Sequence, residues 1–132
     1  MRTLFAITFL AGVLSLCSFQ CHKDDSPHSH VYKGKSVLNA GCGNFVIQVQ
    51  DAGFPAGKMD QQWRDPLADS VYTNVFTVSN VCDMIDAHLN TGDVISFELA
   101  DAPIKKEGCV VCMWYRPAPP TNNIIKNVHK LN

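Results

Sequence analysis

Downstream of residue 30, hydrophobic and polar positions alternate in short runs separated by turn-forming residues. A period of two places the apolar side chains of a strand on one face. Two runs show this period clearly, Asn44 to Asp51 and Asp93 to Ala100. The positions expected to face inward are Phe45, Ile47 and Val49 in the first run and Ile95, Phe97 and Leu99 in the second. We therefore predict a half-buried strand in each run.

Further segments are rich in the β-branched and aromatic residues that favour strands. These candidate strands are Val31–Leu38, Val71–Val81, Lys106–Tyr115 and Ile124–Leu131. Between Val81 and Gly92 the apolar spacing is instead helical, and Gly92 lies just past the expected helix end. The helical apolar positions are Met84, Ile85, His88 and Leu89. Five or six short strands with one short helix predict a mainly β fold, a small antiparallel barrel.

The first twenty residues have a different hydrophobic pattern. Leu4 to Leu16 is apolar apart from Thr8 and Ser15, and Arg2 precedes this run. The run is shorter than the roughly 18–20 apolar residues of a bilayer-spanning helix, but it has the length of a signal-peptide core. We predict a cleaved signal peptide over residues 1–20, a flexible polar tether over residues 21–30 and one domain over residues 31–132.

The residues around the expected cleavage site favour a lipid anchor. Ser18-Phe19-Gln20 is a poor match to the small residues that ordinary signal peptidase prefers. Cys17 and Cys21 are both candidates for lipidation, and neither follows a clean lipoprotein box. Cys21 is followed by His-Lys-Asp-Asp-Ser, which resembles the mature N-terminus of lipoproteins from the Bacteroidota. The resemblance implies palmitate-type acyl chains on Cys21, anchoring in the outer membrane and, from the acidic pair, display at the cell surface.

Cysteine parity supports the same assignment. The chain has six cysteines; if Cys17 leaves with the signal peptide and Cys21 carries lipid, four remain. In an exported chain an even set is expected to form disulfides. Cys109 and Cys112 lie three residues apart on a predicted strand and would point to opposite faces, which favours different partners. We predict two bridges that join Cys42 and Cys82 to Cys109 and Cys112, with the matching left open.

Metal binding and redox chemistry are the alternatives for these residues. A thioredoxin-like role for Cys109-Val-Val-Cys112 needs a following helix, which Pro117, Pro119 and Pro120 prevent. A zinc site built from the four cysteines would lack the second short cysteine pair of a zinc ribbon. Histidines and carboxylates in the tether could hold Zn²⁺ or Cu²⁺ loosely, although a solvated tail is the simpler interpretation. These tether residues are His22, Asp24, Asp25, His28 and His30.

Charge and motif content argue against several other classes of function. The formal net charge is −1, and no basic stripe occurs, which argues against nucleic-acid binding. The sequence contains no nucleophile elbow, phosphate-binding loop, HExxH or EF-hand pattern. We therefore expect neither an enzyme nor a protein that carries a cofactor or a metal.

Two stretches combine aromatic residues with arginine, residue types that are favoured at interfaces. The first, Asp51 to Asn74, is polar, contains Trp63 and Arg64, and is expected to form a long loop. The second is Trp114-Tyr115-Arg116, which precedes a proline run that predicts a stiff connection. The simpler interpretation is a packed loop whose Trp63 caps one barrel end, and a strand that runs into a rigid connection. As binding surfaces, they would take a protein, peptide or glycan.

The order of the predicted elements is similar to an OB-fold. The chain also resembles a group of small uncharacterised lipoproteins of the Bacteroidota, over most of residues 31–131. The motifs are Gly41-Cys-Gly43 before a strand, Gly92-Asp-Val-Ile-Ser-Phe97 and a final Ile124-Ile-Lys-Asn-Val128. The resemblance brings no activity with it. The sequence thus predicts an anchored binding or accessory module of the cell envelope; the alternative is an envelope metal-binding or thiol-redox protein.

Overall fold

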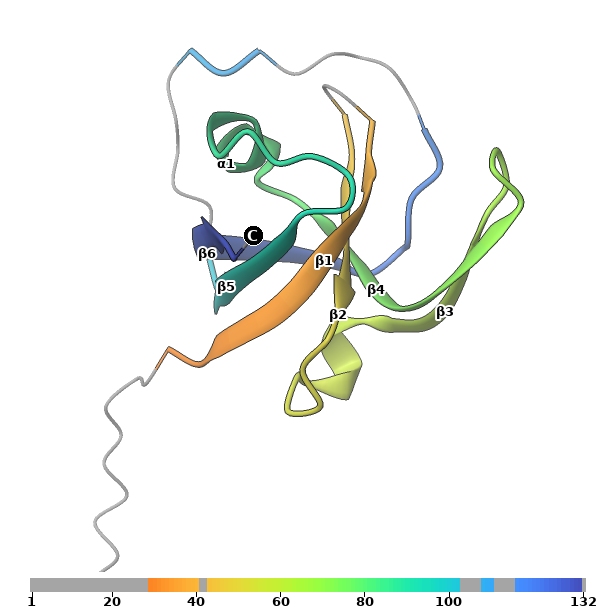
Figure 1. Ribbon diagram of the computed structural model, residues 1–132, viewed down its shortest axis with the longest axis horizontal. Coiled ribbons are helices and arrows are strands. Elements are labelled where there is room, and N and C mark those ends of the chain that lie inside the picture. The colour runs from red at the N-terminus through yellow and green to blue at the C-terminus, as the bar shows by residue number, and fades with distance from the viewer. Residues whose placement is uncertain (1–28, 41–42, 103–107, 111–115, 132) are drawn as a thin grey trace, which may run out of the picture.

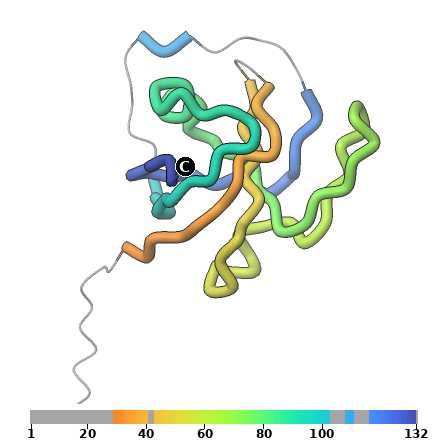
Figure 2. The backbone as a smooth tube through the Cα atoms, in the orientation of Figure 1, coloured from red at the N-terminus to blue at the C-terminus, as the bar shows by residue number. Residues whose placement is uncertain are grey.

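The computed structural model describes residues 29–40, 43–102, 108–110 and 116–131 (Figures 1 and 2). These residues form six strands, one α-helix and one 3₁₀ turn. The strands are β1 (Val31–Asn39), β2 (Phe45–Val49), β3 (Asp60–Asp65), β4 (Ser70–Val78), β5 (Val94–Ala100) and β6 (Asn122–Lys130). The helix is α1 (Val81–Asp86), and the 3₁₀ turn is η1 (Ala56–Lys58).

Five of the six strands close into a ring in the order β1-β2-β4-β6-β5 (Figure 1). The pairings are antiparallel except that of β4 with β6, where Thr77 lies beside Asn122 and Val78 beside Asn123. The helix lies between β4 and β5 in the chain. A ring of five strands with this helix is the arrangement of an OB-like barrel. The predicted mainly β, OB-like fold is confirmed.

The barrel interior holds the faces that the alternation predicted. Phe45, Ile47, Ile95 and Phe97 are at most 1 % exposed. Gly34 on β1 allows close packing here, because a Cβ at this position would lie 2.6 Å from Cγ2 of Ile47. A larger residue at position 34 would therefore push the barrel wall outward.

Different segments fill the two ends of the barrel. Phe54, in the turn after β2, stacks on Phe76 with ring centroids 5.6 Å apart and meets Tyr32 edge-on at 4.9 Å. Met84 and Leu89, from α1 and the turn after it, join the same core at the opposite end (Figure 1). Phe54, and not Trp63 as expected, therefore caps a barrel end.

The first strand changes face along its length. Tyr32, Gly34 and Ser36 are buried on the inner side, and the register with β2 then shifts between Ser36 and Leu38. The bulge turns Leu38 outward, where it packs with Val46 in a second apolar cluster. The candidate functional site lies over this outer cluster.

The helix is shorter than its periodicity predicted. His88 adopts a left-handed conformation with φ of 49°, and its N–H donates to the carbonyl of Ile85. The N–H of Leu89 donates to the carbonyl of Met84, which completes a Schellman ending. Ile85 and His88 are consequently exposed, while Met84 and Leu89 are buried. Gly92, with φ of 100°, lies in the later turn before β5.

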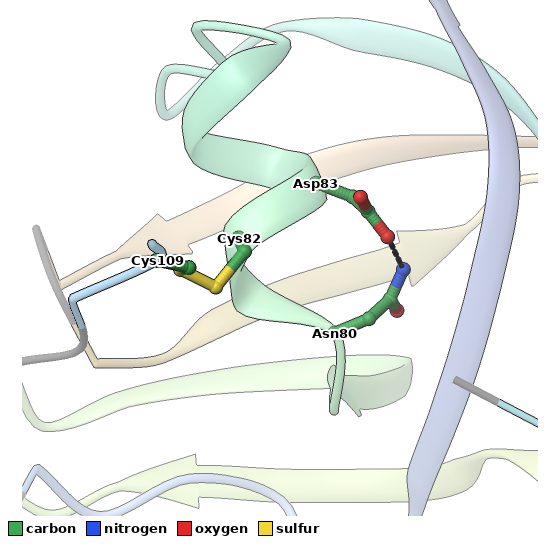
Figure 3. Close-up of a disulfide and its surroundings, with 4 residues drawn as sticks. All are labelled: Asn80, Cys82, Asp83 and Cys109. Carbon is green, nitrogen blue, oxygen red and sulfur yellow. Dashed lines mark hydrogen bonds between the residues drawn. A yellow bond between two sulfur atoms is a disulfide. The ribbon is translucent and has the colours of Figure 1, made fainter. Parts of the chain in front are cut away.

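A disulfide joins Cys82 on α1 to Cys109, with Cα atoms 5.9 Å apart (Figure 3). The bridge is one of those that the sequence predicted. It secures segment 108–110 to the helix. Cys42 and Cys112 lie outside the described residues, so the second bridge stays a prediction.

The side chain of Asn80 connects the start of α1 to β6. Its Nδ2 donates to the carbonyl of Ile125 at 2.6 Å, and its Oδ1 accepts the N–H of Ile125 at 3.0 Å. The same Nδ2 lies 2.5 Å from Oδ2 of Asp83 (Figure 3). The last backbone hydrogen bond between β4 and β6 runs from the N–H of Ser79 to the carbonyl of Asn123. The side-chain amide of Asn80 bonds both backbone groups of Ile125, and so extends this pairing by one step.

One sequence prediction is wrong, and a second gains no support from the part of it that the structure describes. Asp51 to Asn74 is not a long loop, because it contains η1, β3 and the start of β4. In the predicted strand Lys106–Tyr115, the described residues 108–110 form no strand. Gly108 has φ of 82°, which is incompatible with extended backbone. Among the helices of the described residues, none is both long and apolar enough to span a bilayer.

Candidate functional site

The hairpin of β3 and the first half of β4 leaves the barrel as a two-stranded arm (residues 60–75; Figure 1). Within the described residues, β3 pairs with β4 alone, and Trp63 faces Tyr72 while Arg64 faces Val71. The carbonyl of Thr73 accepts a hydrogen bond from Nε2 of Gln48 on β2, at 3.1 Å. The arm is therefore attached to the barrel at its base and open beyond it.

Residues 116–121 run alongside the arm in the opposite direction to β3, and we call this segment the strap. Arg116 lies against Asp65 at one end of β3, and Thr121 lies against Asp60 at the other. Pro117, Pro119 and Pro120 have no N–H and cannot form a strand ladder with the arm. The strap is attached instead through its carbonyls, its side chains and the N–H of Thr121.

Three barrel groups hold the strap in place. Nδ2 of Asn44 donates to the carbonyl of Arg116 at 2.6 Å, and Oγ1 of Thr77 donates to the carbonyl of Pro119 at 2.8 Å. The N–H of Thr77 donates to the carbonyl of Thr121 at 2.9 Å. These bonds place the strap across the outer side of β2 and β4.

Asp65 couples the arm, its turn and the strap. Its carboxylate is fully buried and accepts Nη2 of Arg116 at 2.9 Å and the N–H of Leu67 at 2.9 Å. Burial alone would raise the pKa of Asp65, but the hydrogen bonds from Leu67 and Arg116, with the arginine charge, hold that pKa below its usual value. Asp65 therefore remains a carboxylate inside a protein-lined site.

A second carboxylate fixes the other end of the strap. Asp60 accepts the N–H of Thr121 at 3.0 Å and its Oγ1 at 2.9 Å, one on each carboxylate oxygen. Asp60 pairs with Val75 in the arm, at the point where β4 joins the barrel. The two carboxylates at the ends of β3 thus hold both ends of the strap.

An apolar cluster fills the space between arm, strap and barrel. Trp63 and Tyr72 stack with centroids 5.9 Å apart and an interplanar angle of 20°. They pack with Ala118 of the strap over the buried side chains of Leu38, Val46 and Val75. Trp63 and Tyr72 are only partly buried, so solvent or a ligand can reach the edge of the cluster.

The opposite side of the arm is open. Val71 is 52 % exposed on this side, and Leu67 at the tip is 67 % exposed. Arg64 pairs with Asp69 across the tip, and both side chains are largely exposed. An exposed ion pair of this kind contributes little to stability. The open side therefore combines apolar side chains with Arg64, which can leave Asp69 for another partner at a small cost in free energy.

The structure brings together two of the sequence candidates and separates another. Trp63 and Arg116 meet at the junction of arm and strap, although they lie in the two different predicted stretches. Arg64 points to the open side, away from them. Trp114 and Tyr115 lie outside the described residues.

Sequence reasoning missed the residues that hold the junction together: Asp60, Asp65, Tyr72 and Thr121. One signal was present for Asp65, because an aspartate before Pro66 is typical of a turn. No sequence pattern pairs Asp65 with Arg116, which is 51 positions away. The polar partners come together only once the barrel has formed.

The side chains gathered at this site are hydrogen-bonding, charged and aromatic ones. In the part of the chain that the structure describes, no three His, Cys, Asp or Glu side chains gather as metal ligands. Cys82 and Cys109 are occupied with each other. Comparison of the chain with protein-family models, with curated proteins and with solved structures found no match. The site must therefore be interpreted from its own residues.

Proposed function

We propose that the chain is a lipoprotein, anchored to the outer membrane through Cys21, whose OB-like barrel acts as a binding or accessory module of the cell envelope. The apolar run before Cys21 and the polar residues after it support export and lipidation. The Cys82–Cys109 disulfide supports an oxidising compartment.

One observation carries the binding part of the proposal, namely the exposure of the arm. The arm extends from a barrel whose own core is complete, and its open side presents Leu67, Val71 and Arg64. Arginine is enriched at protein and peptide contact sites, and Arg64 here lies beside the exposed apolar side chain of Val71. The partly buried rings of Trp63 and Tyr72 add an aromatic surface on which a peptide or a glycan can pack.

The test is a screen of the mature protein against peptide and glycan arrays, followed by paired variants. Leu67→Ser with Val71→Ser alters only exposed positions, and Leu131→Ser is the matched control at an exposed leucine outside the arm. We expect the arm variant to lose at least about tenfold in affinity, since two truncated anchors that each cost about 1 kcal/mol together exceed the roughly 1.4 kcal/mol of a tenfold change. Unchanged binding by the arm variant would exclude the open side as the site.

The alternative, a metal-binding or thiol-redox protein, gains no support from the described residues. A redox pair would exchange electrons within Cys109-x-x-Cys112, whereas Cys109 is bonded to Cys82. Counting free thiols in the denatured, unreduced protein separates the two functions. Free thiols at Cys82 and Cys109 would favour the alternative and contradict the disulfide-stabilised module.

A further inference from the structure

The outer sides of β1 and β5, with Gln50 beside β2 and with Lys126 and His129 on β6, form a largely polar face, which we call the β1 face. Val31, 56 % exposed, also lies on it. Across it, Lys33 on β1 lies between Gln50, beside β2, and Ser96 on β5, and Ser96 in turn lies beside His129 on β6. The burial pattern of β1 confirms the orientation, because Lys33 and Lys35 are exposed while Tyr32, Gly34 and Ser36 are buried.

Positive charge dominates the β1 face. Neither Lys33 nor Lys35 forms an ion pair with any described residue. The single carboxylate in these four strands is that of Glu98, whose Oε2 lies 3.6 Å from Nζ of Lys126. At the upper end of the face, Lys130 is paired with Asp93 at 2.7 Å. Within these two ion pairs the opposite charges cancel. The positive charges of Lys33 and Lys35 are not balanced by an ion pair with any described residue.

The chain reaches the barrel at the edge of this same face. Val31, which directly follows the tether, begins β1 opposite Glu98 in the register. Cys21 precedes Ser29 by eight residues, and even a fully extended chain of that length spans only about 30 Å. A lipid attached at Cys21 would therefore hold the membrane within this distance of the β1 face.

We propose that the β1 face lies against the anionic headgroups of the membrane and that Lys33 and Lys35 set this orientation. The inference rests on the proposed lipid anchor. Lysines near an anionic surface contribute enough that two of them favour the facing orientation by about 30-fold at physiological salt. The acyl chains supply the anchoring, and the lysines need only bias the angle of a barrel that is already held nearby.

The orientation has a consequence for the arm. In the ring β1-β2-β4-β6-β5, the strand β4 lies opposite the β1–β5 pair. The arm continues from β4 and extends away from β1 (Figure 1). With the β1 face against the headgroups, the open side of the arm is directed away from the membrane, where a partner can reach it.

The test is lysine footprinting of the acylated mature protein on vesicles. The protein is reconstituted into zwitterionic vesicles and into vesicles containing about one-third phosphatidylglycerol, treated with an amine-acetylating reagent, digested and analysed by mass spectrometry. Lys33 and Lys35 should react at least about threefold more slowly on the anionic vesicles, and 0.5 M salt, roughly a 4 Å Debye length, should remove the difference. Lys58, an exposed lysine outside the β1 face, is the internal control.

A pair of variants shows whether the two lysines cause the orientation. Lys126 lies on the β1 face and should be protected together with them. In Lys33→Gln/Lys35→Gln this protection of Lys126 should disappear, whereas in Lys58→Gln it should persist. The substitutions are at exposed positions, so an unchanged melting temperature confirms that the fold is retained.

The acyl mass of the N-terminal peptide, read from the same digest, separates the two proposals. An acylated peptide with equally reactive Lys33, Lys35 and Lys58 would overturn the orientation and leave the anchor intact. An N-terminal peptide without acyl mass would overturn the anchor and the orientation together. Protection by a soluble anionic polysaccharide, with none from anionic vesicles, would assign the β1 face to a polyanionic ligand and contradict the membrane contact.

Discussion

The barrel interior and the junction between arm and strap are held together in different ways. Inside the barrel, apolar side chains such as Phe76 and Phe97 are buried and pack closely on one another without directional bonds. At the junction, Asp65, Arg116, Asp60 and Thr121 form directional bonds between segments that are 51 and 61 residues apart. The barrel thus depends on a filled interior, whereas the junction depends on specific hydrogen-bonding partners. The same chain builds a densely packed scaffold and a hydrogen-bonded attachment on its outer side.

The largest effect should come from removing an aromatic ring from the interior. Phe97→Ala empties a fully buried position in contact with Tyr32, Phe54 and Phe76, and should reduce the free energy of unfolding by about 3–5 kcal/mol. Urea unfolding followed by circular dichroism measures this change. Leu67→Ala, at an exposed tip, is the control and should change stability by less than about 0.5 kcal/mol. A similar small change for Phe97→Ala would contradict a continuous core.

The disulfide tests the connection between the two regions. Cys82→Ser with Cys109→Ser removes a bridge that closes a loop of 27 residues, and should cost about 3 kcal/mol. Because the bridge attaches segment 108–110 beside α1, and the strap begins at Arg116, hydrogen exchange at Thr121 should also accelerate. Adding reductant to the wild-type protein should reproduce both effects, and a stability that reductant leaves unchanged would show that the bridge contributes nothing.

The buried ion pair should give an intermediate and pH-dependent effect. Because the pKa of Asp65 is lowered in the folded protein, its contribution is complete above the unfolded carboxyl's pKa near 3.8 and is lost as pH falls through the lower folded value. Asp65→Asn should therefore cost about 1–3 kcal/mol at pH 7 and progressively less below about pH 4, where first the unfolded carboxyl and then, at lower pH, the folded one becomes protonated in the wild-type protein.

The exposed pair on the same arm provides the control for that experiment. Asp69→Asn removes the partner of Arg64, which is largely solvent-exposed, and should change stability by less than about 0.5 kcal/mol at either pH. Denaturant titrations of both variants at pH 7 and pH 3 measure the difference. Equal losses for Asp65→Asn and Asp69→Asn would mean that burial of the Asp65 carboxylate has no energetic consequence.

The two regions also differed in how far the sequence could predict them. The alternation around Phe45 and Ile47 determines a strand locally, because every second side chain must be buried. In β3 only Trp63 among six residues is apolar, so the pattern favoured a loop, and the strand forms because β4 supplies its hydrogen-bond partners. The prolines did predict a stiff segment after Arg116. That Arg116 would meet Asp65 depends on how the barrel closes, which no local pattern contains.

The smallest effect should be confined to one end of the strap. Asp60→Asn removes the negative charge, so the two hydrogen bonds between this side chain and Thr121 are no longer charge-assisted, at a cost of about 1 kcal/mol. Amide exchange at Thr121 should accelerate about fivefold, while exchange at Ile47 in the barrel stays unchanged. Thr121→Ser keeps the hydroxyl and should retain wild-type exchange at its own amide. Faster exchange at Ile47 in Asp60→Asn would show that strap and barrel unfold together, which would remove the distinction between scaffold and attachment.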